Sequence, residues 1–138
     1  MRAELVALAV ALMLATVSAS ARPLPAIYKP AQATRGKAVF TKSCAVCHGA
    51  KLQGIMAPAL KGRDFRLMAS NQGLTANTLR RFVVAHMPAY APGSLSPKQY
   101  YEVTAFLLQE NGFPAGKKKL VPNSAAAKRL YIAAFPRG

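Results

Sequence analysis

Cysteines, acidic residues and β-strand patterns are all scarce in this sequence of 138 residues. A structural zinc site usually has two closely spaced ligand pairs, and this chain has only two cysteines and two histidines, with a single C-x-x-C pair. The alternation of apolar and polar residues that marks strands is missing. This argues against a thioredoxin-like redox pair, because such a pair accompanies a βαβ pattern. The length suits one domain, and no run beyond the N-terminal stretch is long and apolar enough to cross a bilayer.

The N-terminal stretch has the pattern of a secretory signal peptide. An apolar run from Leu5 to Val17 follows a short basic start, and Ala19-Ser20-Ala21 offers a small-x-small cleavage site. We expect residues 1–21 to be removed during export. The alternative, an uncleaved membrane anchor, stays open, although the run is shorter than the roughly 20 residues of a spanning helix.

Cys44-Ala45-Val46-Cys47-His48 is the most informative stretch of the chain. C-x-x-C-H is the attachment motif of a c-type haem. Two thiols one helical turn apart can each add across a vinyl group of the porphyrin, and the adjacent imidazole can then bind the iron. A structural disulfide between the two cysteines would leave His48 without a role. The motif therefore predicts one covalently bound haem c.

Helical spacing of apolar residues accounts for most of the remaining chain. Thr75 and Ser96 are plausible N-caps, and Pro97 suits a first helical position. Stretches rich in glycine and proline predict loops at 49–62 and 86–95, the first of them wrapped around one haem face. We expect helices at 32–43, 63–71, 75–85 and 97–110, and a short helix or a tail at 124–134.

A six-coordinate haem needs a second iron ligand opposite His48, and four side chains compete for this position. Methionine is more often core filler than ligand. Met56 follows His48 closely and should stay on the proximal side, and Met68 lies on an expected helix with nothing to fix it. Met87 is far enough along the chain to cross the haem edge, and the proline after it favours an extended conformation. His86 is the rival, and it would give bis-histidine ligation with a lower reduction potential.

Further pieces of the sequence complete a pattern around the motif. They are Gly36 to Phe40, Cys44 to Gly49, Leu52-Gln53-Gly54, Pro58-Ala59-Leu60 with Gly62, Met87-Pro88, Pro92 to Leu95, and Tyr101 to Leu108 with Asn111-Gly112 and Phe113 to Gly116. Over about residues 32–120 the chain resembles the class I cytochromes c. More narrowly, the Pro-Gly-Ser-Leu and Asn-Gly-Phe-Pro-Ala-Gly pieces resemble the small monohaem cytochromes c that serve bacterial quinoprotein (pyrroloquinoline quinone) alcohol dehydrogenases.

The resemblance implies a role for each site residue. Cys44 and Cys47 would form the thioethers to the haem. His48 would be the proximal iron ligand and Met87 the distal one. The carbonyl of Pro58 would hold the other ring nitrogen of His48, which fixes the orientation and basicity of the ring.

The resemblance also implies an all-α fold, the class I cytochrome c fold, with three to five helices around one covalent haem. Its first and last helices would cross, with Gly36 near Phe106. We expect a signal peptide at 1–21, a flexible lead-in at 22–31, the cytochrome c domain at 32–121 and a basic C-terminal tail at 122–138. The tail has no counterpart in the family that we can assign.

Methionine–histidine ligation raises the reduction potential and fills both axial positions. Such a site suits single-electron transfer, so we expect an electron carrier and no enzyme. It would be periplasmic, because thioether attachment in this family is made outside the bacterial inner membrane. Two alternatives are a fixed cytochrome subunit of a dehydrogenase or oxidase complex, and a haem-based peroxidase or gas sensor whose distal methionine dissociates.

The charge of the chain is strongly one-sided. Nineteen Lys and Arg face four Asp and Glu, which gives a formal net charge of +15. Such a field attracts acidic redox partners, such as a quinoprotein dehydrogenase, another cytochrome or a terminal oxidase. An anionic membrane surface is a further expected contact. Nucleic acid is not expected, because the chain has no nucleic-acid-binding motif. We expect a monomer or a subunit of a complex.

Overall fold

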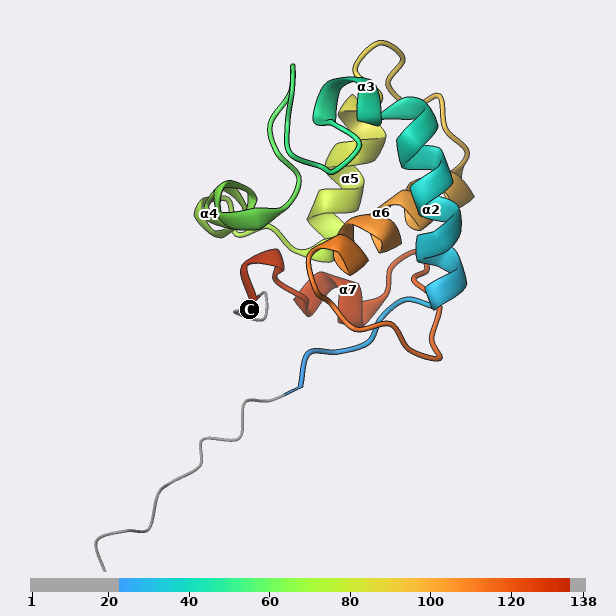
Figure 1. The fold of residues 1–138 in the computed structure, drawn as a ribbon. Coiled ribbons are helices and arrows are strands. Elements are labelled where there is room, and N and C mark those ends of the chain that lie inside the picture. The colour runs from blue at the N-terminus through green and yellow to red at the C-terminus, as the bar shows by residue number, and fades with distance from the viewer. Residues whose placement is uncertain (1–22, 135–138) are drawn as a thin grey trace, which may run out of the picture.

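The computed structural model describes residues 23–134, which fold into helices joined by loops (Figure 1). The predicted signal peptide at 1–21 lies outside the described residues. The elements are α2 (Pro30–Ser43), α3 (Ala45–His48), α4 (Gly62–Asn71), α5 (Ala76–His86), α6 (Pro97–Glu110), α7 (Ala125–Arg129) and the 3₁₀ helix η1 (Ile132–Ala134). These residues contain no β-strand, so the all-α class I cytochrome c fold is confirmed. The short helices α3 and α7 bring the number of α-helices among them to six, above the expected three to five.

The helix ends follow from local sequence. Thr75 Oγ1 accepts a hydrogen bond from the amide of Thr78 at 3.1 Å, and Ser96 Oγ accepts one from the amide of Gln99 at 3.3 Å. Both N-caps agree with the prediction. Helix α2 begins at Pro30, earlier than predicted, because a proline suits the first turn of a helix. None of the described helices has both the length and the hydropathy that a bilayer crossing requires.

Helices α2 and α6 cross at Gly36, and the rest of the domain is arranged around this crossing (Figure 1). A Cβ atom at Gly36 would lie 1.8 Å from the carbonyl oxygen of Glu102 and 2.9 Å from the Cβ of Phe106. Only glycine therefore allows this approach. The rings of Phe40 and Phe106 lie 5.3 Å apart in the same interface. Glu102, which is buried, pairs with Arg35 of the other helix.

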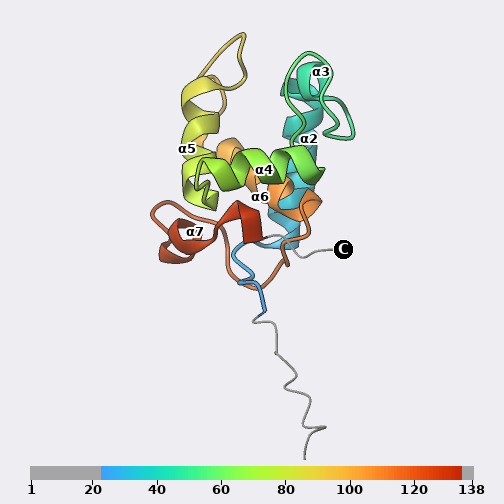
Figure 2. The same ribbon diagram turned by 90° about the vertical axis from the view of Figure 1, so that its left-hand side faces the viewer.

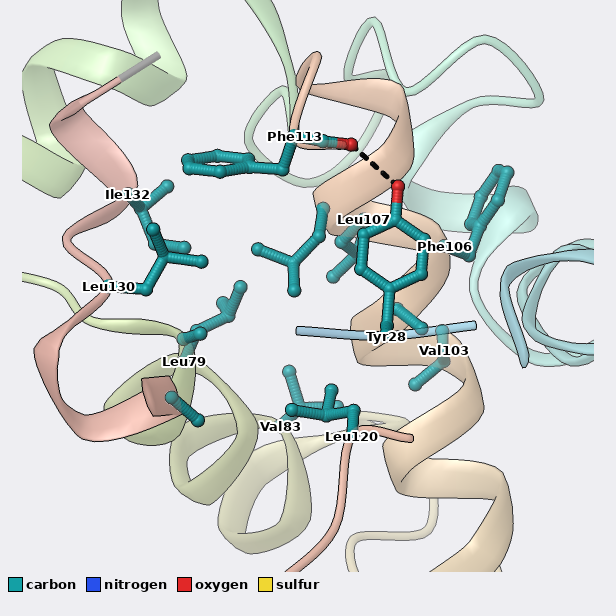
Figure 3. Close-up of a cluster of buried hydrophobic side chains, with 14 of the residues drawn as sticks. Tyr28, Leu79, Val83, Val103, Phe106, Leu107, Phe113, Leu120, Leu130 and Ile132 are labelled. Atoms are coloured by element: carbon teal, nitrogen blue, oxygen red, sulfur yellow. Dashed lines mark hydrogen bonds between the residues drawn. The ribbon is translucent and has the colours of Figure 1, made fainter. Parts of the chain in front are cut away.

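The segment before α2 is extended, as the prolines predict, and it is anchored to the core. Ile27 and Tyr28 are buried, and the hydroxyl of Tyr28 donates a hydrogen bond to the carbonyl of Phe113 at 2.6 Å (Figure 3). The amide of Gly116 donates to the carbonyl of Tyr28 at 2.8 Å. The stretch expected to be a flexible lead-in thus contributes to the core because its phenol finds a distant partner.

The segment after Val121 packs back onto the domain. The amide of Ala76 donates to the carbonyl of Leu130 at 2.9 Å, and the amide of Ile132 donates to the carbonyl of Leu74 at 2.7 Å. Leu130 and Ile132 are buried (Figure 3). Helix α7 thus lies against α5 and η1 against α4, at the end of the molecule away from α3 (Figure 2).

Candidate functional site

A cavity of about 570 Å³ lies between the C-x-x-C-H stretch and the start of the loop after α5. Its volume falls within the roughly 300–1,000 Å³ of cofactor sites. Helices α3 and α5 stand apart above α4 in Figure 2, and α6 contributes Val103 and Leu107 to the wall. The lining is mainly apolar and includes Phe40, Leu60, Phe65, Met68, Leu74, Leu79, Phe82, Val83, Val103 and Leu107. An apolar cavity of this size suits a large, flat, hydrophobic cofactor.

Cys44 and Cys47 open onto this cavity as free thiols. Burial, together with the neighbouring Cys47, raises the pKa of the Cys44 thiol to about 11. Redox-active cysteines of C-x-x-C pairs have lowered pKa values instead. The environment of Cys44 therefore argues against a dithiol redox centre.

His48 is buried at 6% exposure. It lines the cavity and contacts the loop that follows α3. Its Nδ1 lies 2.8 Å from the carbonyl oxygen of Pro58. Because a carbonyl oxygen can only accept a hydrogen bond, Nδ1 carries a proton, and in the neutral ring the lone pair is then on Nε2. This is the contact that the resemblance implies, and it leaves Nε2 able to bind a metal.

The loop that carries Pro58 is held by backbone hydrogen bonds. The carbonyl of Cys47 accepts from three successive amides, those of residues 55–57, at 3.0–3.1 Å. The amide of Gly54 donates to the carbonyl of His48 at 2.8 Å. Gly54 has a φ of +80°, and a Cβ there would lie 2.8 Å from the amide nitrogen of Ala59. The position of the Pro58 carbonyl thus depends on Gly54, which does not itself line the cavity.

Met87 lines the same cavity, just beyond the end of α5. Its backbone is extended, with φ −127° and ψ 149°, as expected before a proline. Its amide donates to the carbonyl of Val83 at 2.9 Å. The hydroxyl of Tyr100 donates to its carbonyl at 2.9 Å. The structure therefore places His48, Pro58 and Met87 around one space.

The three rivals of Met87 occupy different positions. Met56 and Met68 also line the cavity, so lining alone does not select a ligand. Met56 is 71% exposed, and its amide is bound to the carbonyl of Cys47 beside α3. His86 is exposed and is not among the lining residues, and its ring lies 4.6 Å from that of Phe82.

Three polar side chains make long-range hydrogen bonds that sequence reasoning missed. Asn111 Nδ2 donates to the carbonyls of Leu60 at 2.9 Å and of Leu107 at 2.8 Å, which ties the loop after α3 to α6. Gln32 bonds both backbone groups of Leu120, at 3.0 Å and 2.8 Å. Tyr100 is the third. The spacing rules assign Asn111 to a helix stop and Tyr100 to an apolar face, and nothing local signals their distant partners.

A family model described as cytochrome c oxidase, cbb3-type, subunit III, matches residues 31–107. The chain belongs to this cytochrome c family. No curated protein gives a significant match to the cytochrome. Among solved structures, thiosulfate dehydrogenase (TsdBA) from Marichromatium purpuratum in its as-isolated form is similar over 83% of this cytochrome and 26% of its own chain. The sequence identity is 23% and the TM-score is 0.45. The cytochrome thus spans about a quarter of the length of that protein.

Family membership implies haem-based electron transfer and one covalent haem c, and the residues present fit this group. Two free thiols with the C-x-x-C-H spacing, a buried imidazole and an apolar lining meet at one cavity. No group of three or more His, Cys, Asp or Glu side chains gathers in residues 23–134. The donor set therefore suits a haem better than a metal ion bound by protein ligands alone.

Proposed function

We propose that this cytochrome c is a periplasmic carrier of single electrons, with His48 and Met87 as the two axial ligands of its haem. The observation that carries the proposal is the pair of held ligands facing one cavity. His48 is oriented by the carbonyl of Pro58 and Met87 by the hydroxyl of Tyr100. When bound, the haem supplies an iron that changes between its ferric and ferrous states by one electron.

The proximal residues would attach the haem and orient the first iron ligand. The thiols of Cys44 and Cys47 would form the thioethers, and the Nε2 lone pair of His48 would bind the iron. The hydrogen bond from Nδ1 to the Pro58 carbonyl prevents rotation of the ring and raises its basicity. Proximal ligation would therefore rest on the backbone geometry that places the Pro58 carbonyl.

Met87 is favoured over its rivals by the way each is placed. Met56 belongs to the loop bound to Cys47 and so to the proximal side. Met68 lies within α4 and packs against the core. His86 is exposed on the last turn of α5, outside the cavity lining. Met87 lines the cavity just beyond the end of α5, with its amide bonded to Val83 and its carbonyl bonded to Tyr100.

A comparison of Met87→Ala with His86→Ala tests the ligand assignment. Wild type and His86→Ala should both show the near-infrared methionine–iron band and a high reduction potential. Met87→Ala should lose the band, and its potential should fall because a sulfur ligand favours the ferrous state. Retention of the band and the potential in Met87→Ala would rule out this methionine.

The surface charge supports an acidic redox partner. Of the three described acids, Glu102 is buried against Arg35, and Glu110 pairs with Lys61 at 3.2 Å. Asp64 alone is exposed without an ion pair within the described residues. A nearly uniform positive surface steers an anionic partner, and salt screens this attraction.

The donor we propose is a dehydrogenase, as in the quinoprotein-associated cytochromes that the sequence resembles, and the acceptor is another cytochrome or a terminal oxidase. The rate of electron transfer to an acidic partner should fall steeply as salt rises. A rate independent of salt would contradict electrostatic docking. The exported chain should have the mass of residues 22–138 plus one haem, and a mass that includes residues 1–21 would indicate a retained anchor.

A fixed subunit of a larger complex is the second candidate, because the matching family model is named for an oxidase subunit. The burial of Leu130 and Ile132 in the cytochrome's own core favours the free carrier, since much of the C-terminal segment is occupied within the chain. Co-purification with a large partner at high salt would favour the fixed subunit. Elution as a monomer would favour the carrier.

A further inference from the structure

Tyr100 connects the two ends of the loop that begins at Met87. Its side chain is buried at 3% exposure on α6. Its hydroxyl donates to the carbonyl of Met87 at 2.9 Å and accepts from the amide of Leu95 at 3.4 Å. The phenol oxygen of Tyr100 thus links Met87, at the start of the loop, and Leu95, at its end, to α6.

Apart from Tyr100, apolar contacts hold the loop, because Pro88 is buried and Leu95 packs against the core. Its internal hydrogen bonds run from the amide of Ala91 to the carbonyl of Pro88 at 2.9 Å, and from the amide of Ser94 to the carbonyl of Ala91 at 3.2 Å. Both bonds stay within the loop and do not attach it to a helix. Tyr90, at 70% exposure, adds no buried anchor. The hydrogen bonds that attach the loop to α6 therefore concentrate at Tyr100.

The carbonyl of Met87 has a particular need for this donor. The last carbonyls of a helix lack intrahelical partners, and Met87 caps the C-terminal end of α5. Without the phenol, its backbone would be held at the amide, through Val83, and left free at the carbonyl. The Met87 backbone could then turn about that remaining bond and carry its side chain out of the cavity.

We infer that Tyr100 is a positioning residue that keeps Met87 at the iron and so closes the sixth coordination position to other ligands. This inference rests on the proposed ligation by Met87. Tyr100 does not line the cavity, so it acts through the Met87 backbone and not through contact with the cofactor. Its effect should appear as a change in how readily an added ligand displaces the methionine.

Tyr28 provides a matched control. It is also a buried tyrosine, at 1% exposure, and its hydroxyl also donates to a backbone carbonyl, that of Phe113 at 2.6 Å (Figure 3). Neither Tyr28 nor Phe113 lines the cavity. Tyr28→Phe and Tyr100→Phe each remove one oxygen from a buried ring, and they differ in whether the lost bond reaches the Met87 loop.

The experiment uses the haem-loaded protein and titrates the ferric form of wild type, Tyr100→Phe and Tyr28→Phe with imidazole. Loss of one hydrogen bond that favours the closed loop should strengthen apparent imidazole binding about fivefold in Tyr100→Phe. Tyr28→Phe should bind imidazole as wild type does. Amide hydrogen exchange at Leu95 should accelerate in Tyr100→Phe alone, while thermal stability should fall in both variants.

Three results would overturn the inference: no change in imidazole binding in Tyr100→Phe, equal increases in both variants, or unchanged exchange at Leu95. Each would show that the phenol stabilises the fold without positioning Met87. A different result would overturn the proposed ligation itself, namely a wild-type protein without the near-infrared methionine–iron band. The two failures are therefore distinguishable in the same set of samples.

Discussion

The two walls of the haem cavity are built in different ways. On the proximal wall, the carbonyl of Cys47 accepts three amides, and the loop from Gly49 to Lys61 closes on itself with Leu60 bonded to Leu52 at 2.9 Å. On the distal wall, the loop after Met87 has only short internal bonds and depends on Tyr100. One wall is a dense local network of backbone hydrogen bonds, and the other is hydrogen-bonded to α6 through one side chain, that of Tyr100.

This difference matches the demands on the two proposed ligands, His48 and Met87. The proximal ligand is adjacent in sequence to the cysteines that would attach the haem. A network of short-range backbone hydrogen bonds is therefore sufficient to hold it. A distal ligand need only be held firmly enough to stay bound in both oxidation states. The stability of a region follows the number of its buried contacts and hydrogen bonds. We therefore expect substitutions in the proximal wall to unfold the protein. Substitutions in the distal wall should instead open the sixth coordination position to other ligands.

The largest effect should come from removing the proposed proximal ligand. His48→Ala eliminates the ligand beside the attachment site and leaves the Pro58 carbonyl without its partner. We expect the yield of folded, haem-loaded protein to fall more than about tenfold, while Met87→Ala gives a near-normal yield. The haem-to-protein ratio and the helical circular dichroism of purified material measure this. Similar yields for the two variants would contradict the asymmetry.

The next largest effect compares two glycines with positive φ, one on each wall. A Cβ at Gly54, with φ +80°, would lie 2.8 Å from the Ala59 nitrogen and 2.9 Å from the Ala57 oxygen, whereas one at Gly93, with φ +77°, meets nothing within 4 Å. Gly93→Ala should lower the free energy of unfolding by about 1 kcal/mol for the left-handed backbone alone. In Gly54→Ala the new Cβ would also overlap the backbone of Ala57 and Ala59, so the free energy of unfolding should fall by about 2–4 kcal/mol.

Urea unfolding of the haem-loaded variants measures this difference. Equal losses of stability in the two variants would show that crowding at Gly54 is relieved by a small movement of its loop. Gly93→Ala is also informative for the distal wall. It should leave the near-infrared methionine–iron band intact, because it does not touch the hydroxyl of Tyr100.

The sequence predicts the proximal wall better than the distal one, and the reason is the range of the contacts. C-x-x-C-H is contiguous, and the caps at Thr75 and Ser96 act over three residues, so local rules are sufficient. The crossing of α2 and α6 came from the family resemblance, through Gly36. By contrast, Tyr100 meets Met87 only after α6 has packed, and helical spacing assigns a tyrosine to an apolar face.

The same limit applies at the ends of the domain. Prolines predict an extended segment before α2, but they do not reveal that Tyr28 reaches Phe113, 85 residues away. Leu130 and Ile132 follow a basic stretch that gives no sign of where they are buried. Contacts across such separations depend on the whole fold, and no local pattern encodes them.

A smaller effect should follow from Asn111→Ala, which removes the donor that joins the proximal loop to α6. The carbonyls of Leu60 and Leu107 lose their side-chain partner, at a cost of about 1–3 kcal/mol in the free energy of unfolding. Imidazole binding should not change, because the distal loop is untouched. Urea unfolding and the imidazole titration together test this. Stronger imidazole binding in Asn111→Ala would show that the two walls are coupled.

The smallest effect concerns Tyr28, which belongs to neither wall and serves as a reference. Burial raises the pKa of the Tyr28 phenol above its ordinary value of about 10. The folded state thus holds this proton more tightly than the unfolded chain. The resulting stability is fully present below pH ~10 and is lost as pH rises through the higher folded pKa.

Tyr28→Phe has no such proton, so its disadvantage of about 1 kcal/mol at neutral pH should shrink at alkaline pH. Urea unfolding of both proteins from pH 7 to pH ~11 checks this, and a constant difference would show that the phenol does not ionise on unfolding.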